Sequence, residues 1–139
     1  MNGNDRAERA VESRPAVEGE TRSRVALTAA AVELLERLIA EHGPVMFHQS
    51  GGCCDGSAPM CYPVGEFLTG PADVLLGVFA LPDVEPDSAE IEFWMSREQF
   101  EYWKHTHLLV DAVPGRGAGF SLEGPTGRRF LIRSTLLSA

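Results

Sequence analysis

Apolar residues between positions 27 and 39 recur every three or four residues, which is the spacing of a single helical face. Thr28 has a side chain suited to an N-cap, and Gly43-Pro44 is a strong stop signal. The pattern predicts an N-terminal amphipathic helix that ends before Gly43. Its apolar stripe consists of Leu27, Ala30, Ala31, Leu34, Leu35, Leu38 and Ile39.

Most of the remaining apolar pattern is typical of strands. Apolar runs and one alternating segment predict strands over residues 44–49, 73–81, 89–95 and 107–113. Ser96 and Gln99 form a capping box that begins a short helix, with Phe100 and Trp103 on its inward face. Residues 119–124 and 128–134 are expected to pair as a closing hairpin.

This order of elements predicts an α+β domain. We expect a compact mixed or mostly antiparallel sheet, one N-terminal amphipathic helix and one short helix. No internal repeat is visible, and the length suits a single domain, which we assign to residues 25–139. Residues 1–24 mix charged residues with Ser, Pro and Gly and have few large apolar side chains, so they are expected to form a disordered or frayed tail.

The net charge of the chain argues against some classes of binding partner. The first 24 residues hold equal numbers of acids and bases, so the formal net charge of −8 belongs to the rest of the chain. An acidic surface argues against nucleic acid, whose phosphates need a basic face, and against anionic lipid. No apolar run approaches the about 20 residues of a membrane helix, and the N-terminus lacks the apolar segment of a signal peptide. We therefore expect a cytosolic protein with reduced thiols.

All three cysteines lie in one glycine-rich segment, HQSGGCCDGSAPMCY, over residues 48–62. Soft thiolates favour zinc, copper(I) or iron–sulfur clusters, although the spacing of Cys53, Cys54 and Cys61 is not that of a zinc ribbon. Glycines tolerate positive φ, so a turn here could bring the adjacent thiols to one side. The plainer alternative is that each cysteine is a small buried apolar residue.

Three histidines are candidates to complete a metal site with these thiols. His48 begins the segment, while His105 and His107 form a His-x-His after the predicted short helix. Residues two apart on a strand share a face, so both imidazoles could reach one metal ion. Each also has an ordinary structural interpretation: a satisfied strand residue for His48, a helix C-terminal partner for His105 and an exposed strand residue for His107.

Several segments follow one another in a familiar order. Leu27-Thr28 before an alanine run, Gly51-Gly52-Cys53-Cys54-Asp55-Gly56 and Gly117-Ala118-Gly119-Phe120 are similar to segments of the A-type iron–sulfur cluster carriers. The resemblance implies a HesB-like fold and a ligand loop at the cysteines. That family ends in a Cys-Gly-Cys, whereas this chain has no cysteine after Cys61. A cluster would therefore be shared across a homodimer.

Three other stretches carry a closer resemblance. FHQSGGCCDGSAPMCYP, QFEYWKHT and VPGRGAGFSLE resemble a bacterial family catalogued as domain of unknown function 779. Members of that family are often encoded beside NAD-dependent aldehyde dehydrogenases. The resemblance implies an accessory role near aldehyde or alcohol oxidation, with an aldehyde dehydrogenase as a partner.

The leading hypothesis is a small metal- or iron–sulfur-binding accessory protein rather than an enzyme. A transition metal or an iron–sulfur cluster would be its cofactor. One alternative is a metal-free thiol that acts in redox chemistry or reacts with aldehydes. Another is an interaction module that binds an aldehyde dehydrogenase. The candidate ligands are Cys53, Cys54, Cys61, His48, His105 and His107.

Overall fold

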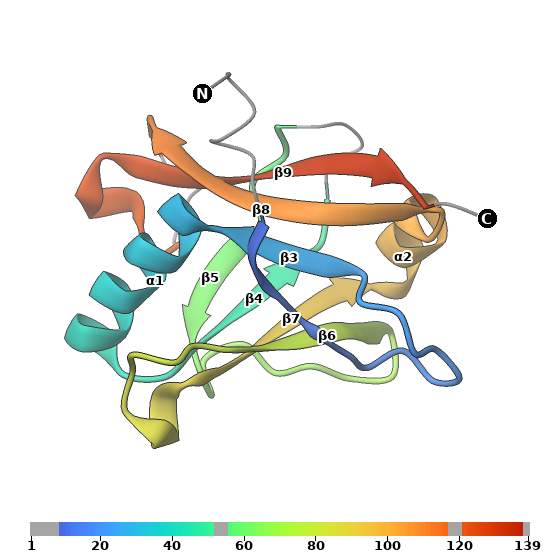
Figure 1. Ribbon diagram of the computed structural model, residues 1–139, viewed down its shortest axis with the longest axis horizontal. Helices are drawn as coiled ribbons and strands as arrows, with labels where there is room; N and C mark the ends of the chain where they lie inside the picture. Colours follow the sequence, from blue (N-terminus) through green and yellow to red (C-terminus); the bar gives the residue numbers. More distant parts are fainter. Residues whose placement is uncertain (1–8, 52–55, 117–120, 138–139) are drawn as a thin grey trace.

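The computed structural model describes residues 9–51, 56–116 and 121–137, which form two mixed sheets and two helices. The first sheet has the strand order β1 (Arg9–Glu12), β3 (Val25–Thr28), β8 (Thr106–Pro114), β9 (Arg128–Leu136). The second has the order β2 (Arg14–Pro15), β6 (Asp73–Ala80), β7 (Glu90–Ser96), β4 (Val45–Gln49), β5 (Met60–Pro63). The sheets are stacked, with α1 (Ala29–His42) at one side and α2 (Arg97–Trp103) at the other (Figure 1). The α+β class with a mixed sheet arrangement is confirmed.

The chain crosses between the two sheets through each helix, and the two crossings run in opposite directions. β3 of the first sheet leads through α1 to β4 of the second, while β7 of the second leads through α2 to β8 of the first. Each sheet has a parallel pair inside it, β3 with β8 and β4 with β7, and antiparallel pairs on either side. The β4–β5 and β8–β9 connections are therefore topologically equivalent, although the sequence shows no repeat.

Both helices begin as their capping residues predict. The Thr28 hydroxyl accepts a hydrogen bond from the backbone N–H of Ala31 at 3.1 Å, and the Ser96 hydroxyl accepts one from that of Gln99 at 3.2 Å. The first helix ends at Gly43, whose φ of 81° lies in the left-handed region that glycine adopts without strain. Neither helix, within the described part of the chain, has the length and apolar character needed to span a bilayer.

Aromatic rings join the two sheets in one apolar core. Phe47 of β4 lies 5.5 Å, centroid to centroid, from Phe93 of β7 in the same sheet and 5.0 Å from Phe130 of β9 in the other. All three rings are fully buried, and the apolar stripe of α1 packs against the same cluster. Burial of such side chains contributes on the order of 2 kcal/mol each, so this cluster is the main source of stability.

Residues 1–8 of the expected tail lie outside the described residues, and residues 9–15 form two strands instead. Residues 9–15 cross from the edge of the first sheet, as β1, to the edge of the second, as β2. Ser13 is the corner between them: its backbone N–H donates to the Val25 carbonyl at 3.0 Å, and its hydroxyl lies 3.0 Å from that of Ser23. These strands are held mainly by backbone hydrogen bonds, and amino-acid composition gives no information about such bonds.

The predicted hairpin of residues 119–124 with residues 128–134 is wrong for its described part, since residues 121–124 form no strand; residues 119 and 120 lie outside the described residues. β9 pairs with β8 along its whole length, from Thr106 opposite Leu136 to Pro114 opposite Arg128. Residues 121–123 form a turn, and Gly124–Thr126 form a short 3-10 helix. β8 is nine residues long and contains several strand-favouring residues. It is therefore a longer partner for β9 than the segment around residue 121.

We expect Gly77→Ala to destabilise the protein by about 1–3 kcal/mol, the usual cost of overpacking. A methyl group at Gly77 would overlap the Ser13 hydroxyl and would lie 3.1 Å from the Arg14 carbonyl oxygen. Urea unfolding measures the loss. Gly124→Ala is the control, because a methyl group there meets no described atom within 4 Å. Equal unfolding midpoints for the two variants would contradict this account of the corner.

Candidate functional site

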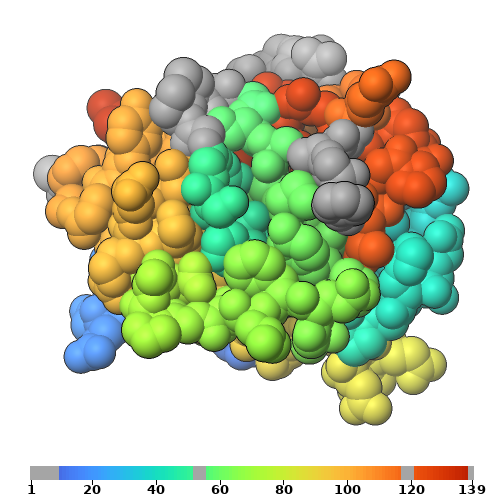
Figure 2. Space-filling view, turned by 180° about the vertical axis from the view of Figure 1, so that it is seen from behind, coloured from blue at the N-terminus to red at the C-terminus, as the bar shows by residue number. Residues whose placement is uncertain are grey.

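The glycine–cysteine loop joins β4 to β5, and its return limb is fixed to β9. Cys53 and Cys54 lie outside the described residues. The backbone N–H of Gly56 donates to the Ile132 carbonyl at 2.7 Å, and the N–H of Ile132 donates to the Ser57 carbonyl at 2.8 Å. The limb emerges at the surface shown in Figure 2, above the light-green segment that follows β5. Residues 56 and 57 of the return limb are thus held to a strand of the opposite sheet.

A reciprocal contact holds the segment that leads into β9. The backbone N–H of Leu122 donates to the Cys61 carbonyl at 3.0 Å, and the Cys61 N–H donates to the Ser121 hydroxyl at 2.8 Å. Each long connection therefore pairs with the strand that follows the other one. We call this region the seam, comprising residues 56–61, 121–123 and 129–132.

Cys61 belongs to the core rather than to an open loop. Its side chain is fully buried among the apolar residues of both sheets, and it lies opposite Phe47 in the β4–β5 register. Burial raises the pKa of the Cys61 thiol far above its ordinary value, and the nearby Glu123 carboxyl raises it further. The thiol is therefore neutral at physiological pH, which fits the ordinary interpretation of a small apolar residue.

Glu123 is a buried acid that the sequence did not single out. It is fully buried, and the Ser121 hydroxyl donates to its Oε1. Burial raises the pKa of the Glu123 carboxyl, while the Ser121 hydrogen bond opposes that rise. Its Oε2 has no hydrogen-bond partner among the described residues. A lone acid before Gly-Pro looks like a turn residue in sequence, so only its neighbours in space reveal it.

His48 is bound to a carboxylate on the outer side of the second sheet. Its Nε2 lies 2.7 Å from Asp73 Oδ1, and its ring lies 4.2 Å from that of Phe67, which also stacks on Tyr62 at 5.0 Å. The backbone N–H of Gly70 donates to Asp73 Oδ2 at 2.9 Å. The segment after β5 thus covers His48, and the His48 hydrogen bond lowers the pKa of the Asp73 carboxyl.

The His-x-His pair is divided by the structure. His105 is exposed in the turn before β8, whereas His107 is in the strand and buried, with its Nε2 3.1 Å from Glu12 Oε1. His107 lies on the first sheet and His48 on the second. Across the described ranges, no three side chains of metal-ligand type come together. Cys61, His48 and His107 each have separate surroundings.

We expect Asp73→Asn to weaken the dependence of stability on acid. A carboxyl whose native pKa is lowered adds stability above its unfolded pKa of about 4, and this stability is lost as pH falls through the native value. Losing a hydrogen bond to a charged group costs about 2 kcal/mol at pH 7. Urea midpoints between pH 7 and pH 3 measure both effects. The exposed Asp83→Asn is the control, and identical pH profiles for the two variants would refute the assignment.

Cys61 should resist alkylation in the folded protein. Its raised pKa keeps the thiol protonated, and no part of its side chain is exposed. Iodoacetamide at pH 8.5 followed by peptide mass spectrometry should leave Cys61 unmodified in buffer and label it in urea. Stability should also fall above about pH 8.5, because the unfolded thiol ionises there while the native one does not. Labelling in buffer at the rate of a free thiol would contradict this placement.

Comparison with known proteins gives one family. The sequence profile described as "Domain of unknown function (DUF779)" matches residues 34–136, from the middle of α1 to the end of β9. No curated protein and no solved structure matches the chain. The matched range includes the glycine–cysteine loop, the seam and all of β4 to β9. The chain belongs to the DUF779 family.

Proposed function

We propose that the protein is a small metal- or iron–sulfur-binding accessory protein whose thiolate ligands are Cys53 and Cys54. The observation that carries the proposal is the burial of Cys61, which leaves the adjacent pair as the thiols of the loop. Soft thiolates favour copper(I), zinc or iron–sulfur clusters. Hydrogen bonds from β9 anchor the loop's return limb, which reduces the ordering that metal binding requires.

We propose His105 as the histidine that adds a ligand. The loop leaves β4 at the end where Gln49 pairs with Met95, and α2 begins directly after β7 at that same end. The seven residues of α2, about 10 Å long at 1.5 Å per residue, carry the chain to His105. His48 and His107 have carboxylate partners, which can orient a ligating imidazole, but they lie on different sheets.

A second copy of the chain would complete the site. Structural zinc and cluster sites usually need four protein ligands, and each chain supplies two loop thiols. We therefore propose a homodimer with the metal or cluster at its interface. A HesB-like relation to the A-type carriers also belongs to this proposal; the shared order of helix, strand and cysteine loop supports it. The resemblance noted above makes an aldehyde dehydrogenase the proposed client.

Anaerobic purification followed by metal analysis and visible spectroscopy tests the proposal. We expect about half an equivalent of a transition metal per chain, or an iron–sulfur spectrum, after reconstitution. Cys53→Ser and Cys54→Ser should each abolish binding, His105→Ala should weaken it, and Cys61→Ala should retain it. Less than about a tenth of an equivalent in the unaltered protein would refute metal binding.

The same variants separate the two alternatives. A Cys53 or Cys54 thiol pKa well below 8.5 without bound metal would favour redox or aldehyde chemistry. Capture of an aldehyde dehydrogenase that survives serine replacement of both cysteines would favour an interaction module. Under the metal proposal the cysteine variants lose both the metal and any client that requires it.

A further inference from the structure

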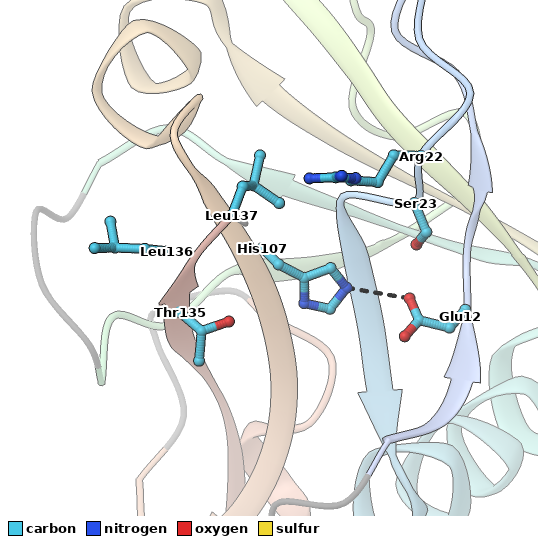
Figure 3. Close-up of a pocket in the computed structure, with 7 residues that line it drawn as sticks. All are labelled: Glu12, Arg22, Ser23, His107, Thr135, Leu136 and Leu137. Carbon is cyan, nitrogen blue, oxygen red and sulfur yellow. Dashed lines mark hydrogen bonds and ion pairs between the residues drawn. The ribbon is translucent and has the colours of Figure 1, made fainter. Parts of the chain in front are cut away.

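A polar hollow on the first sheet gathers side chains from four separate segments of the chain (Figure 3). It has a volume of about 360 Å³, which is in the range of small-molecule sites. Among the described residues, β1, the connection before β3, β8, the end of β9 and the residue after it contribute to the hollow. We call it the His107 hollow; its lining consists of Glu12, Arg22, Ser23, His107, Thr135, Leu136 and Leu137.

The hydrogen bond to Glu12 fixes how His107 presents its ring. An ionised carboxylate only accepts hydrogen bonds, so Nε2 of a neutral His107 carries the proton and donates it to Glu12 Oε1 at 3.1 Å. Nδ1 is then a hydrogen-bond acceptor. Figure 3 shows this nitrogen turned away from Glu12, and His107 lies directly across from Thr135 in the β8–β9 register. In its neutral form, His107 therefore brings a hydrogen-bond acceptor to the lining of the hollow, and the residue is only 7% exposed.

The other walls specify the rest of a ligand. The Arg22 guanidinium extends over the hollow toward Leu137 (Figure 3), and its five N–H donors allow it to serve a ligand as well as protein neighbours. Guanidinium is well matched to a carboxylate. Leu136 is 81% exposed at the rim, which leaves apolar surface for a short carbon chain to cover. The Glu12 carboxylate disfavours a ligand that carries a second negative charge, so a monocarboxylic acid fits better than a dicarboxylic acid.

We propose that the His107 hollow binds a short carboxylic acid that has an O–H or N–H donor on the neighbouring carbon, as in 2-hydroxy and 2-amino acids. The carboxylate contacts Arg22, the donor contacts His107 Nδ1, and the carbon atoms lie against Leu136. The site is independent of the cysteine loop, since none of its residues belongs to the loop or to the seam.

Calorimetric titration with L-lactate, L-alanine and propionate tests this assignment. Lactate or alanine should bind at least ten times more tightly than propionate, which lacks the donor; tenfold corresponds to about 1.4 kcal/mol. Tighter binding of lactate would identify a hydroxy acid, and tighter binding of alanine an amino acid. Absence of saturation by either compound at about 50 mM, or equal affinity for propionate, would overturn the proposal.

Variants locate the binding. His107→Gln keeps a donor for Glu12 but removes the ring nitrogen, so it should weaken the tighter ligand at least tenfold while a melting curve shows a folded protein. His42→Gln, at a histidine outside the hollow, should change nothing, and equal losses in both variants would refute the site. If His107→Gln fails to fold, Leu136→Asp at the exposed rim should give the same loss by repelling the carboxylate, and unchanged affinity there would refute it. Cys53→Ser should leave this binding intact, which separates it from the metal proposal.

Discussion

The backbone hydrogen bonds between Ser57 and Ile132, and between Leu122 and Cys61, hold the two sheets together at the edge where both long connections end. Each of these two contacts joins a connection of one sheet to a strand of the other sheet. The opposite edge is joined differently, by residues 9–15, which pass from one sheet to the other around Ser13. At Ile132 and Cys61 these bonds occupy outward backbone groups of the edge strands β9 and β5, which could otherwise pair with another chain.

This arrangement separates the candidate chemistry into distinct environments. The seam places a neutral thiol and a buried acid, Cys61 and Glu123, in the interior, where burial disfavours their charged forms. The two buried histidines lie instead on the outer sides of the sheets, each tied to a carboxylate from a distant part of the chain. Burial in this protein therefore does not mark one common site. Two of these buried groups lie in the interior between the sheets, and the two histidines lie on the outer sides.

Local signals in the sequence were sufficient for features that depend on a few neighbouring residues. The caps at Thr28 and Ser96 and the inward face of α2 are confirmed because each needs only a hydroxyl, a nearby N–H and helical spacing. The predicted partner of β9 was wrong because strand pairing is decided by contacts between distant residues. The role of Glu12 was missed for a similar reason. Its segment has a tail-like composition, and its significance comes from His107, 95 positions away.

The candidate ligands show the same limit. Spacing brought Cys61 together with its two neighbours as one group, yet a strand that begins at Met60 carries it into the core. His105 and His107 were expected to share a face, but the strand begins between them, at Thr106. In both cases the start of a strand separates residues that their spacing in the sequence had grouped. Element boundaries within one residue are beyond what amino-acid pattern specifies.

The two crossings of the chain between the sheets also affect how the chain folds. Neither the segment through β5 nor the segment from β6 onward contains the central parallel pair of either sheet, because each pair takes one strand from each half. A nascent half-chain thus has no complete sheet on which to bury its apolar faces. Since both parallel pairs join distant segments, we expect the chain to fold cooperatively and slowly compared with proteins of mainly local contacts. The two halves of the chain therefore complete each other's sheets and do not form independent modules.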